Sequence, residues 1–495
     1  MPGSAWLTDD GRIDGHAPDH VGRTHCAELW FTRDRVYKRK RPVALGFLDF
    51  TTLAARRAAC HREVELNRRL APDVYLGVVD VHDAAGTTVD VAVEMRRLPD
   101  DRRLATLAAA GAGAGVDGCV RSVARQMAVF HAAQPPAVHA ERYAGVTALR
   151  ANWKDNLAVL RAHGDAVPTA VVAALAADVD RYLDGRRPLI GSRIASGVVR
   201  DGHGDLQARD IFCLPDGPRV LDCLEFSDRY RIGDVLLDTA FLAMDLERLG
   251  RPDLARALLD TYRELTDAHH PLSLVHHHVA YRAGVRAKVA CLSADADATG
   301  ERAGPLAALA VDHLRRGRIR LVVVGGLPGT GKSTLAAMLS RRHGWMLLRT
   351  DEVRKDLVGV AHGRAGGADA YRPDVTAATY TEVLRRAERL LGMGESVVLD
   401  ASWSAARHRA DAVAVAARTS SELWQLRCDV APAIARARLA GRSGDASDAT
   451  RAVYDEMATR FAPWDDAVVI ATAAPPAAVA DTVDRAIGLP PDPDE

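Results

Sequence analysis

The chain has 495 residues, more than one hydrophobic core usually supports, so we expect two or more domains. Hydrophobic residues make up 48% and charged residues 26%, a balance that is typical of globular proteins and excludes a largely disordered chain. Lys and Arg together number 65, as do Asp and Glu, which excludes the global basic field that drives binding to nucleic acids or membrane surfaces. We therefore expect small-molecule or protein partners.

The N-terminal segment and the cysteines favour a cytoplasmic protein. The first residues, MPGSAWLTDDGRIDGH, lack the basic segment and apolar run of a secretory signal, and no stretch is long and apolar enough to cross a bilayer. The 7 cysteines are scattered and form no CxxC pair, which argues against a disulfide framework or a zinc site. We expect a reducing compartment and no membrane association, and the oligomeric state stays open.

The first 300 residues predict a mostly β lobe followed by a mostly helical one. Between about residues 24 and 95, short β-type runs such as ELWFTRDRVYKRK, with a turn at Arg33-Asp34, bracket one helical stretch, AARRAACHREVELNRRLA. Ala- and Leu-rich segments from Val120 to Leu183 then have helical spacing. The polar stretch SADADATGERAGP, from Ser293 to Pro305, is the predicted linker.

Beyond the linker, strands and helices alternate. We predict strands in RIRLVVVGG, WMLLR and ESVVLDAS, and helices in KSTLAAMLSRRHG and DVTAATYTEVLRRAERLLGMG. Such alternation is typical of right-handed βαβ units, so the second half of the chain is expected to build a parallel sheet.

The strongest motif is GLPGTGKST, which satisfies the pattern G-x-x-x-x-G-K-[ST] between a predicted strand and a predicted helix. Its glycines let the main-chain N–H groups and the helix N-terminus face a polyphosphate, to which a lysine adds a point charge and a hydroxyl a magnesium ligand. The alternative, a glycine-rich connecting turn, does not explain this context. We therefore predict binding of ATP, with GTP as the alternative, by Gly326, Leu327, Pro328, Gly329, Thr330, Gly331, Lys332, Ser333 and Thr334.

Charged residues that follow the next two strands are candidates for acceptor and metal chemistry. Asp351 can take a proton from a substrate hydroxyl, and Arg354 can hold an anionic or polar substrate. Asp400, at the end of a later strand, is suited to orient magnesium or its waters. The alternatives are a helix-capping carboxylate, a solvated arginine and a turn residue.

Two further arginines, Arg438 and Arg442, lie one helical turn apart before a Gly/Ser/Asp-rich loop. Arginines on a mobile flap can cover transferring phosphates and exclude water. An ordinary basic helix face is the alternative.

The region from about Arg318 to Thr472 resembles the small P-loop kinases of the gluconate-kinase and zeta-toxin type, in its strand-end TD, the following R and its Arg-rich lid helix. The resemblance implies Asp351 as the substrate base, Arg354 as a substrate contact and Arg438 or Arg442 as lid residues. It indicates a reaction type and leaves the substrate open.

The first half carries a second candidate site around HGDLQARDIF. Kinase-fold phosphotransferases need a base, a metal ligand a few residues later and an acidic metal ligand on a following strand. Asp205, Asp210 and Asp222 supply carboxylates at these positions. Lys38 is placed to pair phosphates, with Glu63 as its ion-pair partner.

These features are similar to the aminoglycoside-phosphotransferase group of the protein-kinase-like fold, and the whole chain resembles bacterial two-domain proteins that join such a domain to a P-loop kinase-like domain. The usual loop of the group reads HGDLH followed by an Asn, whereas this chain has Gln207 and Asp210. The added negative charge of Asp210 changes the balance of charge at the predicted magnesium site. It therefore weakens the expectation that this site transfers phosphate. A binding or regulatory module that keeps the kinase fold is the alternative.

The predicted fold class is α/β and α+β. We expect a bilobal protein-kinase-like domain at 1–300, a linker or bridging helix at 301–317, a P-loop NTPase domain with a parallel sheet at 318–488 and a disordered tail at 489–495. The predicted function is ATP- and Mg²⁺-dependent phosphorylation of a small hydroxylated acceptor, chiefly in the P-loop domain. The alternative is a nucleotide-binding regulatory protein with a silent kinase-like domain and slow ATP hydrolysis.

Overall fold

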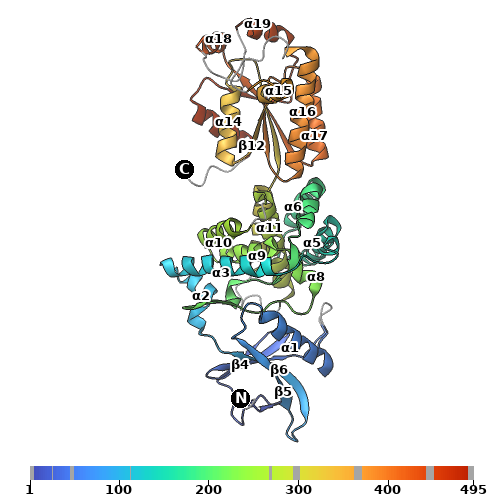
Figure 1. Ribbon diagram of the computed structural model, residues 1–495, viewed down its shortest axis with the longest axis vertical. Coiled ribbons are helices and arrows are strands. Elements are labelled where there is room, and N and C mark those ends of the chain that lie inside the picture. Colours follow the sequence, from blue (N-terminus) through green and yellow to red (C-terminus); the bar gives the residue numbers. More distant parts are fainter. Residues whose placement is uncertain are drawn as a thin grey trace. The chain divides into compact units, whose positions relative to one another are not determined.

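The computed structural model describes eight stretches of the chain: 5–24, 26–44, 49–111, 113–266, 270–293, 302–361, 371–441 and 451–488 (Figure 1). The chain forms two compact units. The first unit comprises Met1–Val172, Gly191–His270 and His278–His313, and the second comprises Ala173–Ile190, Pro271–His277 and Leu314–Glu495. The predicted tail and most of the predicted linker lie outside the described residues, whereas much of the predicted bridging segment forms α13 (Ala303–Arg316).

The first unit begins with a six-stranded sheet in the order β1-β5-β6-β4-β3-β2. β1 pairs in parallel with β5, and the other neighbours are antiparallel, including the predicted hairpin at Arg33-Asp34. Helix α1 (Leu53–Asn67), capped by the Thr52 hydroxyl, packs Cys60 and Val64 against the sheet. The strands are β1 (Leu7–Thr8), β2 (His20–Arg23), β3 (Ala27–Phe31), β4 (Arg35–Lys40), β5 (Tyr75–His82) and β6 (Thr88–Arg96).

The rest of the first unit is mostly helical, as predicted. Its main helices include α2 (Leu104–Ala109), α3 (Gly113–Ala133), α5 (Val146–Ala162), α9 (Leu236–Arg248) and α10 (Pro252–Leu265). Helices α6 (Thr169–Gly185), α7 (Arg187–Ala195) and α11 (Leu272–Leu292) contribute residues to both units. Among these helices run two short antiparallel pairs, namely β7 (Val199–Asp201) with β10 (Ile232–Asp234) and β8 (Ile211–Leu214) with β9 (Gly217–Val220).

A disulfide bond joins Cys119 of α3 to Cys213 of β8. The expectation drawn from the scattered cysteines is therefore wrong for this pair. The two residues are 94 positions apart in the sequence, so no local spacing pattern predicts the bond. The bond attaches the β8–β9 hairpin to α3, which lies far upstream in the sequence.

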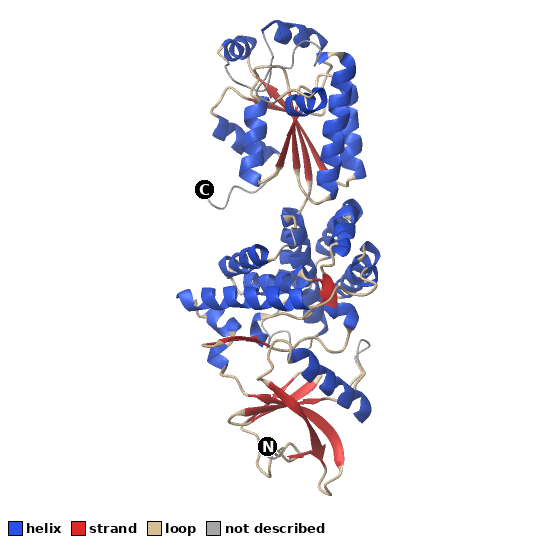
Figure 2. Cartoon of the chain, in the orientation of Figure 1, coloured by secondary structure: helices blue, strands red, loops and turns tan. Residues whose placement is uncertain are grey.

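The second unit is built on a five-stranded sheet whose strands are all parallel, which confirms the prediction from alternating strands and helices (Figure 2). The spatial order is β12-β13-β11-β14-β15. The strands are β11 (Arg320–Gly325), β12 (Met346–Arg349), β13 (Val397–Asp400), β14 (Glu422–Asp429) and β15 (Val468–Ala471).

Helices cover both faces of this sheet, with α14 on one side and α16 and α17 on the other (Figure 1). Alternate residues of β11 face the two sides, so that Val322 packs with α14 and Val323 with α16. The helices are α14 (Lys332–His343), α15 (Thr350–Val358), α16 (Pro373–Gly392), α17 (Ala406–Arg418), α18 (Pro432–Ala440), α19 (Arg451–Arg460) and α20 (Pro476–Ala486). In the described part of the chain, no helix is long and apolar enough to span a bilayer.

Candidate active site

The glycine-rich motif lies between the fully buried strand β11 and the start of α14 at Lys332, which is the context that its pattern requires. All three of its glycines have positive φ, of 133° at Gly326, 77° at Gly329 and 89° at Gly331. A Cβ atom at Gly326 would lie 2.5 Å from the carbonyl oxygen of Cys428. Any side chain there would therefore displace the main chain, so glycine is required for this tight turn.

Contacts within the loop hold its shape. The Lys332 Nζ atom donates to the Leu327 carbonyl at 2.9 Å, and the Thr330 hydroxyl donates to the same carbonyl at 2.7 Å. The Thr472 hydroxyl, from the segment after β15, donates to the Thr330 carbonyl at 2.6 Å. Ser333 lies in the first turn of α14, beside the N-terminal N–H groups that favour an anion.

The predicted acceptor residues lie on α15, directly after β12. The Arg354 Nη1 atom is 2.8 Å from the Asp351 Oδ1 atom, and the Arg354 guanidinium lies over the Tyr371 ring, 4.7 Å from its centre. Arg354 is only 8% exposed, and its Nε atom has no hydrogen-bond partner among the described residues. A buried donor without a partner is costly, so this guanidinium is suited to bind a polar or anionic group of a ligand.

Asp400 ends β13 between the ends of β12 and β11, since its Cα atom is in register with Arg349 on one side and Val324 on the other. Its Oδ2 atom lies 3.2 Å from the Arg349 Nε atom, and its carbonyl accepts a hydrogen bond from Thr350. The fold thus brings Asp351, Asp400 and the glycine-rich loop to one edge of the sheet. This is the carboxyl edge, where open α/β sheets bind their ligands.

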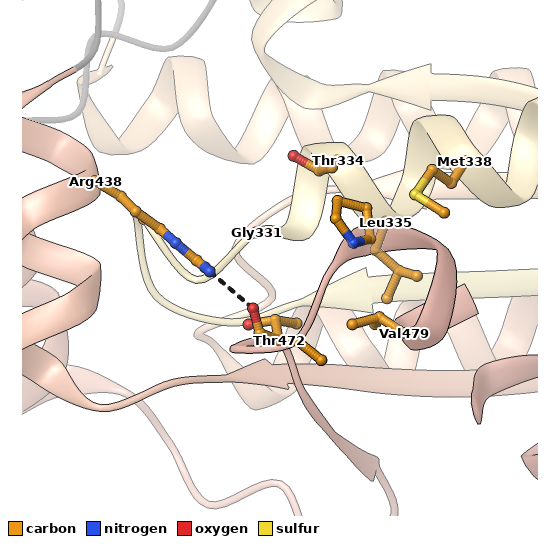
Figure 3. A pocket seen from close by; sticks show the side chains of 10 residues that line it. Gly331, Thr334, Leu335, Met338, Arg438, Thr472 and Val479 are labelled. Atoms are coloured by element: carbon orange, nitrogen blue, oxygen red, sulfur yellow. Dashed lines mark hydrogen bonds between the residues drawn. The ribbon is translucent and has the colours of Figure 1, made fainter. Parts of the chain in front are cut away.

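A cavity of ≈ 320 Å³ opens beside the glycine-rich loop (Figure 3). Arg438 points into it from α18, and its Nη2 atom donates to the Thr472 carbonyl at 2.8 Å. Arg438 thus lies beside the glycine-rich loop, whereas Arg442 lies outside the described residues. The cavity is lined by Gly329, Gly331, Thr334, Leu335, Met338, Arg438, Thr472, Ala474, Pro476 and Val479.

The sequence interpretation missed the side of the cavity that follows β15. Thr472, Ala474 and Pro476 belong to no motif, and Val479 lies on α20. Their one sequence signal is the short apolar run VVIA that precedes them, which forms β15 and was not among the predicted strands. In a parallel sheet, residues that follow such a strand lie at the carboxyl edge.

The first unit brings together three of its predicted site residues. The Lys38 Nζ atom lies 2.9 Å from the Glu63 Oε1 atom and 2.6 Å from the Asp222 Oδ1 atom. The other oxygen of Glu63 is 2.5 Å from the Nζ atom of Lys40, which also contacts Glu225. Lys40 was not predicted, although it follows Lys38 by two positions on the same strand and so shares its face.

Asp222 is held in an uncommon conformation, with φ at +65°. Its N–H group donates to the Tyr75 hydroxyl at 3.1 Å, and the next N–H group, of Cys223, donates to the Asn67 side chain at 2.8 Å. The ammonium group of Lys38 lowers the pKa of the Asp222 carboxyl and outweighs the effect of burial. Asp222 is therefore an anion fixed against Lys38.

The loop with the two unusual residues is ordered by side chains of its own unit. The Gln207 Nε2 atom donates to the Asp205 Oδ1 atom at 2.7 Å, and Asp238 accepts hydrogen bonds from the N–H groups of His203 and Gly204. Burial, followed by the charge of Asp222, raises the pKa of Asp210 to about 7. The negative charges of Asp222 and Asp205 thus oppose ionisation of Asp210, although the Arg209 Nε atom lies 3.4 Å from the Asp210 Oδ2 atom.

Comparisons with known proteins give a family for the chain. Residues 321–464 match the family model of an AAA domain. The chain is 40% identical over 483 residues to the uncharacterized proteins Rv2004c and MT2060 of Mycobacterium tuberculosis and Mb2027c of Mycobacterium bovis, covering 94% of this chain and 96% of each relative. The chain belongs to this family. The AAA-domain match agrees with the loop geometry and supports a nucleotide-binding P-loop domain in the second unit.

Solved structures also show similarity to part of the chain. A sugar kinase from Janibacter sp. HTCC2649 is 15% identical, covering 35% of this chain and 96% of its own, with a TM-score of 0.27. A gluconokinase from Sinorhizobium meliloti 1021 is 18% identical, covering 34% of this chain and 90% of its own, with a TM-score of 0.24.

Proposed function

We propose that the second unit is an ATP- and Mg²⁺-dependent phosphotransferase that acts on a hydroxyl group of a small molecule. The observation that supports it best is the meeting of three strand ends at one edge of the sheet. β11 leads into the glycine-rich loop, β12 into Asp351 and Arg354, and β13 ends in Asp400. A phosphate donor and a hydroxyl acceptor bound at this edge would lie next to each other.

Each residue then has a defined role. Lys332 and the loop N–H groups would stabilise the phosphates, and Asp351 would accept the proton of the acceptor hydroxyl. The acceptor oxygen forms a bond to the γ-phosphorus, the bond from that phosphorus to the bridging oxygen breaks, and ADP leaves with the electron pair. Arg354 would orient the acceptor through its Nε atom, which no described residue contacts by a hydrogen bond.

The residues fit a magnesium ion that arrives with the nucleotide. Within the described stretches there is no group of three or more His, Cys, Asp or Glu side chains that could hold a metal ion by itself. Mg²⁺ commonly takes one or two protein ligands, nucleotide oxygens and several waters. Ser333 would bind the ion directly and Asp400 through its waters, and the bound ion would neutralise charge on the phosphates.

The cavity beside the loop supplies a place for the nucleotide base. Its wall combines the apolar side chains of Leu335, Met338, Ala474, Pro476 and Val479 with the guanidinium of Arg438. A flat heteroaromatic ring suits such a wall, because a guanidinium plane stacks on it and apolar groups cover the rest.

Transfer of the γ-phosphate from radiolabelled Mg-ATP to a panel of small hydroxylated molecules tests the proposal. We expect the wild-type protein and a Lys154→Ala control, altered at an exposed lysine of the first unit, to label the same acceptor, and Lys332→Ala to label none. Transfer that survives Lys332→Ala and disappears with Asp205→Ala would move the reaction to the first unit.

A second candidate function belongs to the first unit. We propose that it binds a nucleotide through Lys38, which Glu63 and Asp222 hold in place and which would contact the phosphates. The hydrogen bond from Gln207 occupies one oxygen of Asp205, and this favours binding or regulation over transfer. In a Lys332→Ala background, Lys38→Met should abolish the nucleotide binding that remains, and unchanged binding would contradict this role.

A further inference from the structure

The loop that follows Asp400 contains a main-chain conformation that L-residues rarely adopt. Trp403 has φ at +52° and a fully buried side chain. For a bulky residue this is a genuine outlier, and such outliers persist only when the surrounding structure fixes them. The contacts of residues 401–405, which we call the Trp403 loop, show what the conformation achieves.

On one side, the Trp403 loop holds the start of the glycine-rich loop, which is the proposed phosphate-binding loop. The Gly326 N–H group donates to the Ser402 carbonyl at 3.1 Å, and the Ala401 N–H group donates to the Val324 carbonyl at 3.3 Å. A Cβ atom at Gly325 would lie 3.1 Å from the Trp403 Cβ atom and 2.4 Å from the ring of Trp464. Gly325, the last residue of β11 before the glycine-rich loop, thus lies between the Trp403 Cβ atom and the Trp464 ring.

On another side, the Trp403 loop is tied to α16. The Trp403 N–H group donates to the Tyr380 hydroxyl at 3.2 Å, and that hydroxyl lies 3.1 Å from the Ser402 hydroxyl oxygen. The Tyr380 ring stacks on His408 of α17 with a centroid distance of 3.9 Å. Helix α16, which carries Tyr380, also packs against α15, which carries the proposed acceptor residues Asp351 and Arg354.

Arg409 of α17 joins the Trp403 loop to the segment that follows α19. Its Nη1 atom donates to the Trp403 carbonyl at 2.8 Å and to the Ala462 carbonyl at 3.4 Å, and its Nη2 atom donates to the Pro463 carbonyl. The guanidinium also lies 5.1 Å from the ring centre of Trp464. Arg409 is 6% exposed, so it is a buried cation, and its hydrogen bonds to the described residues all go to main-chain carbonyls.

We propose that Arg409 is a positioning residue that fixes the phosphate-binding loop by clamping the Trp403 loop to residues 461–464. The planar fork of a guanidinium suits this role, because it reaches carbonyls of two chain segments at once and lies flat on an indole ring. A lysine offers a point charge in place of the fork and cannot make all of these contacts. The inference rests on the proposed function of the second unit, since the loop that it positions is the proposed phosphate site.

Nucleotide affinity and local hydrogen exchange test the proposal together. In a Lys38→Met background, which removes the nucleotide site proposed in the first unit, we expect Arg409→Ala and Arg409→Lys to raise the Kd for Mg-ATP by about tenfold or more. Amide protection should be lost at residues 322–330 and 461–464 and be kept in β14 and α20. Arg418→Ala is the matched control, because Arg418 ends the same helix in an exposed ion pair with Glu388.

The outcomes separate positioning from a general loss of stability. Protection lost throughout the second unit would overturn the proposal, as would a wild-type Kd in both variants. Addition of guanidinium ions to Arg409→Ala should restore part of the affinity, whereas ammonium should not. If Arg409→Ala fails to fold, Arg409→Lys decides on its own. If the wild-type protein binds no nucleotide, the proposed function fails, and the exchange pattern alone then decides whether Arg409 positions the loop.

Discussion

Asp210 makes the first unit sensitive to pH. Its pKa of about 7 in the folded protein lies above the value of about 3.9 for an exposed aspartate, so the folded state favours the protonated form. The protonated Asp210 side chain therefore contributes to the free energy of unfolding at low pH, and this contribution is lost as the pH rises from about 4 towards 7. Asparagine at this position cannot ionise and should avoid that loss.

We accordingly expect Asp210→Asn to unfold with nearly the free energy of the wild type at pH 4, and to be more stable by more than about 1 kcal/mol at pH 8 without magnesium. Chemical denaturation across this pH range measures the difference. Asp165→Asn, altered at an exposed carboxylate, is the control and should show no such trend. A difference that does not change with pH would mean that Asp210 is charged throughout.

Arg438 offers a second prediction at this scale. Because its guanidinium lies in the wall of the cavity and bonds to the Thr472 carbonyl, it is placed to contact the base of a bound nucleotide. Arg438→Ala should raise the KM for Mg-ATP about tenfold with a smaller effect on kcat. Steady-state kinetics test this, with Arg460→Ala at an exposed position of α19 as the control. A fall in kcat at unchanged KM would assign Arg438 to the transferring phosphate instead.

At the scale of elements, the β8–β9 hairpin matters because it separates Asp210 from Asp222. Asp210 directly precedes β8, Asp222 follows β9 by two residues, and the Leu221 N–H group donates to the Asp210 carbonyl at 2.9 Å. The disulfide from Cys213 fixes this hairpin to α3. Loosening the hairpin should therefore disturb both carboxylates together.

Replacing both disulfide cysteines, by Cys119→Ser with Cys213→Ser, is expected to lower the free energy of unfolding of the first unit by about 2–5 kcal/mol. Amide exchange in residues 211–222 should become faster. The control replaces the free cysteines Cys26 and Cys291, which should leave that exchange unchanged. Equal exchange in the two proteins would show that the disulfide does not hold the hairpin.

The sequence predicts elements that depend on nearby residues, and it does not predict contacts between residues far apart in the chain. The parallel sheet and the glycine-rich loop follow from local periodicity and from adjacent residues, and both are present. The pairing of Cys119 with Cys213, and that of Lys40 with Glu225, joins residues 94 and 185 positions apart. Spacing along the chain cannot reveal such pairs, because only the packing of the elements creates them.

The same limit applies within the candidate site. Asp351 and Asp400 could be assigned to the carboxyl edge of the sheet because each follows a predicted strand. Their pairing with Arg354 and Arg349 depends on side-chain directions that the sequence does not specify. Arg409 carries no motif at all, since its hydrogen bonds go to main-chain carbonyls, which every sequence provides.

At the scale of the whole molecule, each proposed nucleotide site is built within one unit. Lys38, Glu63 and Asp222 all belong to the first unit, whereas Lys332, Thr330 and Thr472 all belong to the second. A substitution in one site therefore removes no side chain from the other. The effects on nucleotide binding of one substitution in each site should therefore add, as they do for sites that share no contacts.

Calorimetric titration of Mg-ATP into four proteins tests this independence. We expect two binding events in the wild type, one in Lys332→Ala, one in Lys38→Met and none in the double variant, because each lysine supplies the phosphate charge of its own site. Loss of both events in Lys332→Ala alone would contradict independent sites. Since the two lysines lie in separate units, that result would require a conformational equilibrium shared by both units, and binding at one site would then change affinity at the other by the same factor in either direction.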